Sequence, residues 1–211
     1  MDGLGLILGE DGIVRCFWCG RDALYRPYHD HEWGRPVAED RALFAKLCLE
    51  VFQAGLSWSL ILHRREVLHL AFGGFAPEAV ARLTAADVAR LLADRRLIRH
   101  RGKIEAMIAN ARAALAIIER EGSLASFLWR FAPAKELPPP RSAGEFLARR
   151  CAREAIALAN ELKHRGFRFF GPTTVYAFMQ AMGFVNDHLE GCSVRSDVAM
   201  CRARFRAAYP V

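Results

Sequence analysis

Residues 48–58, C-L-E-V-F-Q-A-G-L-S-W, form the corner between two predicted helices. Asp40 is a suitable N-cap for the first helix, and Gly55 is suited to the left-handed conformation that commonly ends a helix. Ser57 can cap the second helix, which we expect to run to about Phe72. The sequence therefore predicts two helices that meet at a tight turn.

Glu50 lies on the face of the first helix that should point inward. Leu43, Leu47 and Ala54 share that face, because residues three and four apart are neighbours on a helix. An ionised carboxylate rarely stays buried without a partner. Trp58, in the first turn of the second helix, would lie near Glu50. An acid beside an indole suggests a pocket for a flat, positively charged group. The alternative is a hydrogen-bonded core glutamate beside a core tryptophan.

The composition predicts an all-α fold. The 211 residues fit one domain or two packed lobes, and 53% of them are hydrophobic. Alanine, leucine and arginine dominate, and runs of β-branched residues are few. The net charge of +7 and the pI of about 9.4 suit a nucleic-acid-binding protein, but they suit an ordinary basic enzyme equally well.

No apolar run has the length of a membrane span, and the first residues lack the basic start of a signal peptide. We therefore expect a cytoplasmic protein with no membrane partner. In that setting cysteines bind metal or are buried more often than they form disulfides. The chain has six: Cys16, Cys19, Cys48, Cys151, Cys192 and Cys201.

The remaining organisation follows from apolar spacing and capping residues. Residues 1–14 are expected to be a flexible lead, and residues 15–34 an ordered segment rich in loops. Residues 15–192 would form a single domain of two packed helical lobes, followed by a frayed or solvated basic tail at residues 193–211. Further helices are predicted at about 84–94, 104–118, 123–129, 142–165 and 173–183.

A basic hairpin, residues 97–104 (L-I-R-H-R-G-K-I), joins two of these helices. Such a turn presents backbone N–H groups and a helix N-terminus to an anion. Its polar and flexible residues, which suit a DNA phosphate, are Arg99, His100, Arg101, Gly102 and Lys103. The shape is that of a helix-hairpin-helix motif. The alternative is an ordinary helical hairpin with a solvated turn.

Two cysteines and two histidines have spacings that suit a metal site. Cys16 and His29 stand near the start of the chain, and His188 and Cys192 are four residues apart near its end. Such a set makes a closed tetrahedral zinc site of the structural kind, which would join the two ends of the chain. Cys19 could take the place of Cys16 as a metal ligand, and His31 could take the place of His29. The alternative to a metal site is that the four residues are unrelated.

Together these segments resemble the 3-methyladenine DNA glycosylase I family. The shared motifs are R-C-x-W at 15–18, Y-x2-Y-H-D-x-E-W-G at 25–34, C-L-E-x2-Q-A-G-L-S-W at 48–58, I-x-H-R-G-K-I at 98–104, K-x-R-G-F-x-F-x-G at 163–171 and Y-x-F-M-Q-A-x-G-x-V-N-D-H at 176–188. The departures are extra residues before Arg15, a longer basic tail and the additional Cys19.

The resemblance implies an enzyme that excises 3-methyladenine from double-stranded alkylated DNA and releases the free base. It implies a monomer with a helix-hairpin-helix glycosylase fold, no lyase lysine and no catalytic aspartate of the kind found in other glycosylases of this fold. It also implies one structural Zn²⁺ held by Cys16, His29, His188 and Cys192. The base-pocket residues carried over by the resemblance are Glu50, Tyr28 and Trp58, with Tyr25 and Trp33 nearby.

The chemistry of the lesion agrees with these residues. Methylation at N3 makes adenine a cation and weakens its bond to the sugar, so a strong general acid is unnecessary. We expect Trp58 to stack on the extruded base, Glu50 to accept a hydrogen bond from its exocyclic amine, and Tyr28 to contact its edge. Leu56 would probe the gap left in the duplex, or else be a core residue.

Three other functions fit parts of the sequence. One is a non-catalytic DNA-binding module with a structural zinc. The second is a zinc-stabilised helical enzyme that acts on a small cationic metabolite. The third is a helix-hairpin-helix glycosylase with a different lesion preference.

Overall fold

The protein is mostly helical, as predicted. The structure, a computed structural model, describes residues 5–20, 22–149 and 152–209. Its helices are α1 (Tyr25–His31), α2 (Asp40–Gln53), α3 (Trp58–Ala71), α4 (Pro77–Ala81), α5 (Ala85–Ala93), α6 (Arg101–Glu121), α7 (Leu124–Trp129), α8 (Ala143–Ala148), α9 (Arg153–His164), α10 (Pro172–Ala181) and α11 (Arg195–Ala208). Short 3-10 turns, η1 (Phe17–Cys19) and η2 (Gly73–Phe75), and the strands β1 (Leu6–Leu8) and β2 (Val14–Cys16) complete the described elements.

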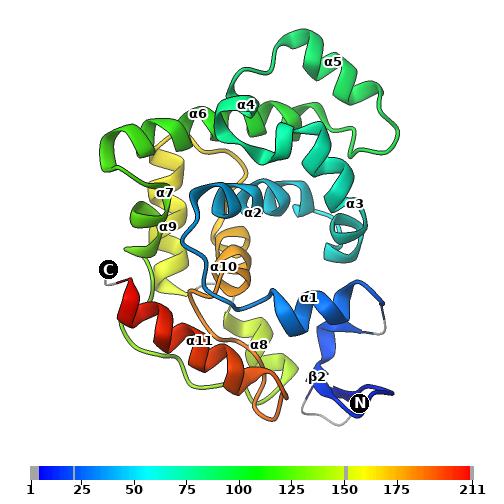
Figure 1. Ribbon diagram of the computed structural model, residues 1–211, viewed down its shortest axis with the longest axis vertical. Helices are drawn as coiled ribbons and strands as arrows, with labels where there is room; N and C mark the ends of the chain where they lie inside the picture. Colours follow the sequence, from blue (N-terminus) through cyan, green and yellow to red (C-terminus); the bar gives the residue numbers. More distant parts are fainter. Residues whose placement is uncertain (1–4, 21, 150–151, 210–211) are drawn as a thin grey trace.

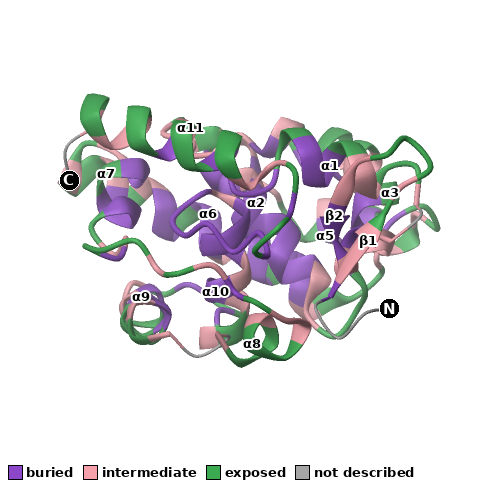
Figure 2. Ribbon diagram, turned by 90° about the horizontal axis from the view of Figure 1, so that it is seen from below, coloured by how far each residue is buried: buried purple, intermediate pink, exposed green. Residues whose placement is uncertain are grey.

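Helix α2 crosses the middle of the molecule. It contacts α3, α6, α7 and α10. Figure 1 shows α4, α5 and α6 on one side of α2, and α10 and α11 on the other. Figure 2 shows that the buried residues concentrate along α2, α6 and α10. The Glu50 side chain therefore lies on the helix around which both halves of the protein pack.

The corner between α2 and α3 has the predicted form. Gly55 has a φ of 78°, a left-handed conformation that side chains disfavour. The Ser57 hydroxyl accepts a hydrogen bond from the Leu60 N–H at 3.3 Å and caps α3. The prediction for the other end of α2 was wrong. Glu39 is the N-cap there, and its carboxylate accepts hydrogen bonds from two N–H groups in the first turn of α2.

Asp40 has a different role from the one expected. Its carboxylate accepts hydrogen bonds from the Ser123 hydroxyl at 3.0 Å and from the Ala125 N–H at 2.7 Å. Asp40 thus joins the start of α2 to the start of α7, two elements far apart in sequence. Spacing within one helix cannot reveal such a partner.

The N-terminal region is more regular than predicted. In place of a flexible lead, residues 6–16 contain an antiparallel strand pair in which Leu6 lies opposite Cys16. The Ser193 N–H donates to the Val14 carbonyl at 2.9 Å, so β2 also contacts the C-terminal part of the chain. The segment expected to be rich in loops contains the helix α1.

The C-terminal region also differs from the prediction. Residues 195–208 form α11 rather than a frayed tail, and Val198 and Arg202 on this helix are buried. The Arg202 guanidinium pairs with Glu136 at 2.7 Å. The single helix predicted over 142–165 is two helices, α8 and α9. Cys151 lies outside the described residues.

None of the described helices combines the length and the apolar character needed to cross a membrane. None of the cysteines that the structure describes is in a disulfide, and all but Cys201 are buried: Cys16, Cys19, Cys48, Cys192 and Cys201.

Candidate functional site

A small cavity of about 160 Å³ lies beside the corner, between α1, α2, α3 and α10. A cavity on the order of 150 Å³ is large enough for one aromatic ring. We call this cavity the base pocket. It is lined by Trp18, Tyr25, Tyr28, Trp33, Lys46, Glu50, Gln53, Trp58, Phe146, Ala177, Gln180 and Ala181. All five residues that the sequence analysis assigned to a base pocket are among them.

Glu50 is buried in the pocket wall and is paired. Only 3% of its surface is exposed. Its carboxylate lies 2.8 Å from the ammonium of Lys46, one turn earlier on α2. The sequence analysis missed Lys46, although its spacing of four residues from Glu50 is a recognised helical ion-pair spacing.

The Lys46 ammonium is enclosed by electron-rich groups. It lies 3.4 Å from the centroid of the Trp58 ring and donates to the Tyr28 hydroxyl at 3.0 Å. Burial lowers the pKa of Lys46, although the Glu50 carboxylate acts in the opposite direction. Burial also raises the pKa of Tyr28, and the nearby Glu50 adds to that shift. The pocket thus holds a positive charge out of contact with bulk water.

The aromatic walls leave two hydrogen-bond donors without partners. Tyr28 and Trp58 have ring centroids 5.2 Å apart, and those of Trp18 and Trp33 are 4.8 Å apart. Among the residues that the structure describes, the indole N–H groups of Trp18 and Trp58 are buried and make no hydrogen bond. Unsatisfied buried donors are uncommon in folded proteins, and a water or a ligand often satisfies them.

The base pocket continues into a wider hollow of about 510 Å³, which we call the vestibule. It is lined by Glu50, Gln53, Ala54, Gly55, Leu56, Phe146, Thr173, Thr174, Ala177 and Gln180. Leu56 lies on its rim with 40% of its surface exposed, so it is not a core residue. A ligand too large for the pocket could therefore rest in the vestibule and insert one ring.

One wall of the pocket is fixed by a buried carboxylate. The Gln180 amide donates to Asp187 at 2.9 Å, and the Tyr176 hydroxyl donates to the same oxygen at 2.6 Å. Arg149 pairs with the other oxygen of Asp187 at 2.7 Å. Because its NH₂ group is used in this way, Gln180 is held in one orientation beside the pocket.

The basic hairpin lies between α5 and α6, and α6 begins at Arg101 rather than at Ile104. The His100 side chain caps α6 by accepting a hydrogen bond from the Lys103 N–H at 3.2 Å. Arg99, His100 and Arg101 are exposed, and Arg101 lies 3.4 Å from Glu105. Gly102 lies inside the first turn of the helix.

Lys103 differs from the prediction. Only 5% of its surface is exposed, and its ammonium donates to the carbonyl oxygens of Phe52 at 2.8 Å and Ala54 at 2.5 Å. It therefore satisfies carbonyls at the C-terminal end of α2 instead of pointing toward a phosphate. The expectation of a phosphate contact from Lys103 is corrected, and this residue ties the hairpin to the corner.

Cys16, His29, His188 and Cys192 form a second site, the metal cluster. Their ligand atoms all lie within 4.8 Å of one another, and all four residues are buried. The Cys192 sulfur lies 3.5 Å from His188 Nδ1 and 3.6 Å from His29 Nε2. Cys19 and His31, which competed in the sequence analysis, do not belong to it. The chain thus brings together a set of side chains that could hold a metal ion.

The other ring nitrogens of these histidines have partners that orient the rings. His29 Nδ1 lies 2.8 Å from the Asp30 carboxylate, and His188 Nε2 lies 3.3 Å from the Trp33 carbonyl. Arg15 in turn donates to Asp30. Burial would raise the pKa of Asp30, but hydrogen bonds from Arg15 and His29 outweigh burial and lower it. Metal-binding histidines commonly have such partners.

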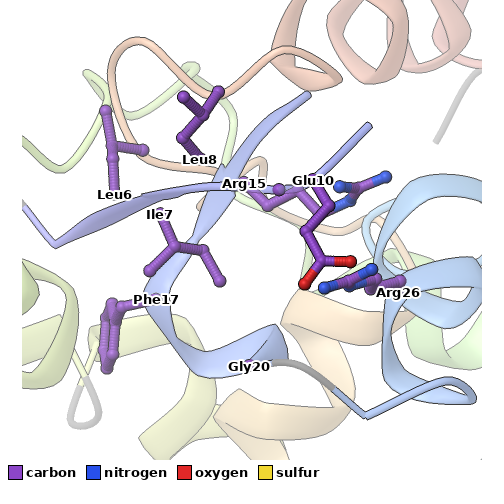
Figure 3. Close-up of a pocket in the computed structure, with 9 residues that line it drawn as sticks. Leu6, Ile7, Leu8, Glu10, Arg15, Phe17, Gly20 and Arg26 are labelled. Carbon is purple, nitrogen blue, oxygen red and sulfur yellow. The ribbon is translucent and has the colours of Figure 1, made fainter. Parts of the chain in front are cut away.

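A third hollow of about 520 Å³ lies beneath the N-terminal strand pair (Figure 3). Glu10 and Arg26 point toward one another near Arg15, whereas Ile7 and Phe17 lie on the other side of the hollow. None of the predicted base-pocket residues lines it, so we do not identify it with the site described above.

Both the sequence and the fold of this chain are similar to those of known proteins. The sequence model of the methyladenine glycosylase family matches residues 18–196. The DNA-3-methyladenine glycosylase 1 of Escherichia coli strain K12 is 44% identical over 190 residues, which span 85% of this chain and 96% of that protein.

Solved structures are similar over the same region. A crystal structure of a 3-methyladenine DNA glycosylase I has a TM-score of 0.81 and 45% identity, and covers 85% of this chain and 98% of its own. The Staphylococcus aureus 3-methyladenine DNA glycosylase I, solved to explain its recognition of 3-methyladenine, has a TM-score of 0.77 and 38% identity. It covers 83% of this chain and 93% of its own. Since both sequence and fold agree over most of its length, this chain belongs to the methyladenine glycosylase family.

Proposed function

We propose that this protein is a monofunctional DNA glycosylase that hydrolyses the N-glycosidic bond of 3-methyladenine in alkylated double-stranded DNA. The observation that carries the proposal is the cation already enclosed in the base pocket. The Lys46 ammonium lies against the Trp58 ring and the Glu50 carboxylate, so these groups can hold a positive charge away from bulk water. A neutral adenine would gain less from them.

In this proposal Trp58 stacks on the extruded cationic base, and Glu50 accepts a hydrogen bond from its exocyclic amine. Tyr28 contacts the base edge, and Tyr25 and Trp33 complete the walls. Positive charge on the purine makes it a good leaving group. Tight binding of the extruded nucleotide then contributes to catalysis by holding the weakened bond in place for attack by water.

The DNA would lie across the vestibule and the basic hairpin. We propose that α5, the hairpin and α6 act as a helix-hairpin-helix motif, in which Arg99, His100, Arg101 and the backbone at Gly102 contact phosphates. Leu56, exposed on the vestibule rim, would enter the space vacated by the base. The hairpin and the pocket are connected through Lys103, which contacts the end of α2. One chain carries all these parts, so we take the enzyme to act as a monomer.

We further propose that the metal cluster holds one structural Zn²⁺. Sulfur and nitrogen ligands of a tetrahedral zinc lie about 3.6 Å apart. Three distances between cysteine sulfurs and histidine nitrogens in the cluster are 3.5, 3.6 and 3.7 Å. The donor set leaves no position for a reacting water, so the ion would stabilise the fold by joining β2 and α1 to the C-terminal turn.

The test is release of free bases from randomly methylated DNA, identified by chromatography. Wild-type protein should release 3-methyladenine. Glu50→Gln should lower kcat/KM by about 10- to 100-fold, because a hydrogen bond to a charged group contributes roughly 1.5–3 kcal/mol. Glu66→Gln is the matched control, since Glu66 is exposed on α3. Absence of 3-methyladenine among the products, or full activity in Glu50→Gln, would contradict the proposal.

A further inference from the structure

Lys46 lies in the wall of the base pocket, against the groups to which the base is proposed to bind. Its ammonium contacts the same three groups that we assign to the lesion, at 2.8 Å from Glu50, 3.0 Å from the Tyr28 hydroxyl and 3.4 Å from the centroid of the Trp58 ring. A base that stacks on Trp58 must bring its ring atoms to about 3.5–4 Å from the indole. The ammonium and the base therefore cannot both lie on the face of the Trp58 ring that the ammonium covers.

The charges around the pocket also oppose simultaneous binding of the Lys46 ammonium and a cationic base. Glu50 is the one carboxylate among the described residues that line the pocket. Glu32, after α1, lies further away and pairs with Arg65 of α3. Tyr25 and Tyr28 on α1 carry hydroxyl groups, and burial raises the pKa of Tyr25 to about 12. Two cations within a few ångströms, with one buried carboxylate between them, repel each other strongly at low dielectric.

We propose that Lys46 is an internal competitor of the substrate, which binds Trp58 and Glu50 through its ammonium and must leave them before a cationic base can stack there. This inference rests on the proposed function, because the base it concerns is the methylated purine. The apparent affinity for the base is then reduced by the fraction of molecules in which Lys46 occupies the pocket.

The exchange has a consequence for undamaged DNA. A cationic base replaces one positive charge beside Glu50 with another. A neutral base that displaced the ammonium would leave the buried carboxylate without a partner, which is strongly unfavourable. Lys46 therefore keeps the affinity of the pocket for any neutral base low while the enzyme searches DNA.

The inference also predicts how the affinity for a cationic purine changes with pH. Burial lowers the pKa of Lys46, so the ammonium loses its proton more readily than an exposed lysine does. A neutral amine is held less strongly by Glu50 and Trp58 and competes less. Binding of a cationic purine should accordingly tighten as the pH rises.

The experiment measures binding of 3,9-dimethyladeninium, a purine cation, by calorimetry between pH 6.5 and 9. Lys46→Met keeps an unbranched side chain but removes the charge. It should bind the cation at least about tenfold more tightly than wild type at pH 7 and show little dependence on pH. Lys135→Met, at an exposed position in the loop before α8, is the matched control and should behave as wild type.

Each result separates the two proposals. If wild type and Lys46→Met both fail to bind the cation, the proposed base pocket is wrong. If wild type binds but Lys46→Met binds equally or less tightly, only the competition is overturned. Should Lys46→Met not fold, as judged by circular dichroism, Lys46→Leu replaces it, with the same expected result and the same result that overturns the competition.

Discussion

Lys103 connects the basic hairpin to the end of α2 beside the vestibule. Its ammonium satisfies two carbonyl groups at the end of α2 while its backbone belongs to the first turn of α6. The end of α2 leads directly into Gly55 and Leu56 on the vestibule rim. The buried ammonium of Lys103 therefore helps to set the position of the vestibule rim relative to the basic hairpin.

We expect Lys103→Met to lower the free energy of unfolding by about 2 kcal/mol, because the two carbonyl groups lose a charged donor. The slope of DNA affinity against salt concentration should stay the same, since no phosphate contact is removed. Chemical denaturation and binding at several salt concentrations provide the two measurements. Lys163→Met, at an exposed position on α9, serves as control. A smaller salt slope in Lys103→Met would return this residue to the DNA interface.

Single residues also show the limit of reasoning from sequence. The inward position of Glu50 was predictable from helical spacing, and the residues that surround it were suggested by the family resemblance. Lys46 was missed because a lysine on a helix is usually solvated, and only the packing of α1 and α3 against α2 makes this one buried. Gln180 was missed because its role depends on Asp187, whose burial is a property of the folded chain.

The basic hairpin is the element whose role can be tested most directly. Arg99 and Arg101 are exposed at the start of α6, where the helix N-terminus also favours anions. Replacing both with glutamine should reduce the salt slope of DNA binding by about 1 to 2, because each phosphate contact contributes close to 0.9. Binding of the free base should not change.

The control for this pair is glutamine at Arg120 and Arg204, which are also exposed. Arg120 lies near the far end of α6, about 28 Å from Arg101 at the usual helical rise. The control variant should keep the wild-type salt slope. An equal reduction in both variants would mean that the positive charge acts through the whole surface and not through the hairpin.

Among the elements, those with a strong apolar period and a capping residue were predicted best. The helix predicted at about 84–94 is present and begins with a capping box of Thr84 and Asp87, and α3 and α7 begin as predicted, after Ser57 and Ser123. Helix α1 was missed because it has only seven residues, too few to show a period. Helix α11 was missed because arginine dominates it and only a few of its residues are buried.

For the whole molecule the metal cluster is the decisive feature, because it joins segments from both ends of the chain. Metal analysis of the purified protein should find about one zinc per chain. Removal of the ion by a strong chelator should lower Tm by several degrees or more, since binding energy at such sites is folding energy. The decrease in Tm on chelation should be smaller at acidic pH, because protons compete for the histidine and cysteine ligands and the ion then contributes less to stability.

Cys16→Ser and Cys19→Ser form a matched pair for this prediction. Both residues are buried, and only Cys16 belongs to the cluster. Cys16→Ser should lose the metal and most of the stability that it confers, whereas Cys19→Ser should keep one zinc per chain. Retention of zinc by Cys16→Ser would exclude this ligand set.

The predominance of helix was predictable for the whole molecule, because amino-acid composition and the spacing of apolar residues determine local structure. Which distant segments meet was not predictable from physical reasoning alone. The pairing of Cys16 with His188 was suggested by spacing and by the resemblance. Arg15 and Asp30 belong to the shared motifs, but nothing in the sequence indicated that they pair with one another and support His29. Such contacts depend on the folded topology.

The separation of 172 residues between Cys16 and His188 has a consequence for biosynthesis. A ribosome adds about 5–20 residues per second, so the first two ligands wait roughly ten to thirty seconds for the last two. During that time Cys16 and His29 offer an ion only two ligands, so an ion would bind weakly or need further ligands from another molecule. The newly made chain therefore depends on helices such as α2 and α6 to hold it together until its final segment leaves the exit tunnel.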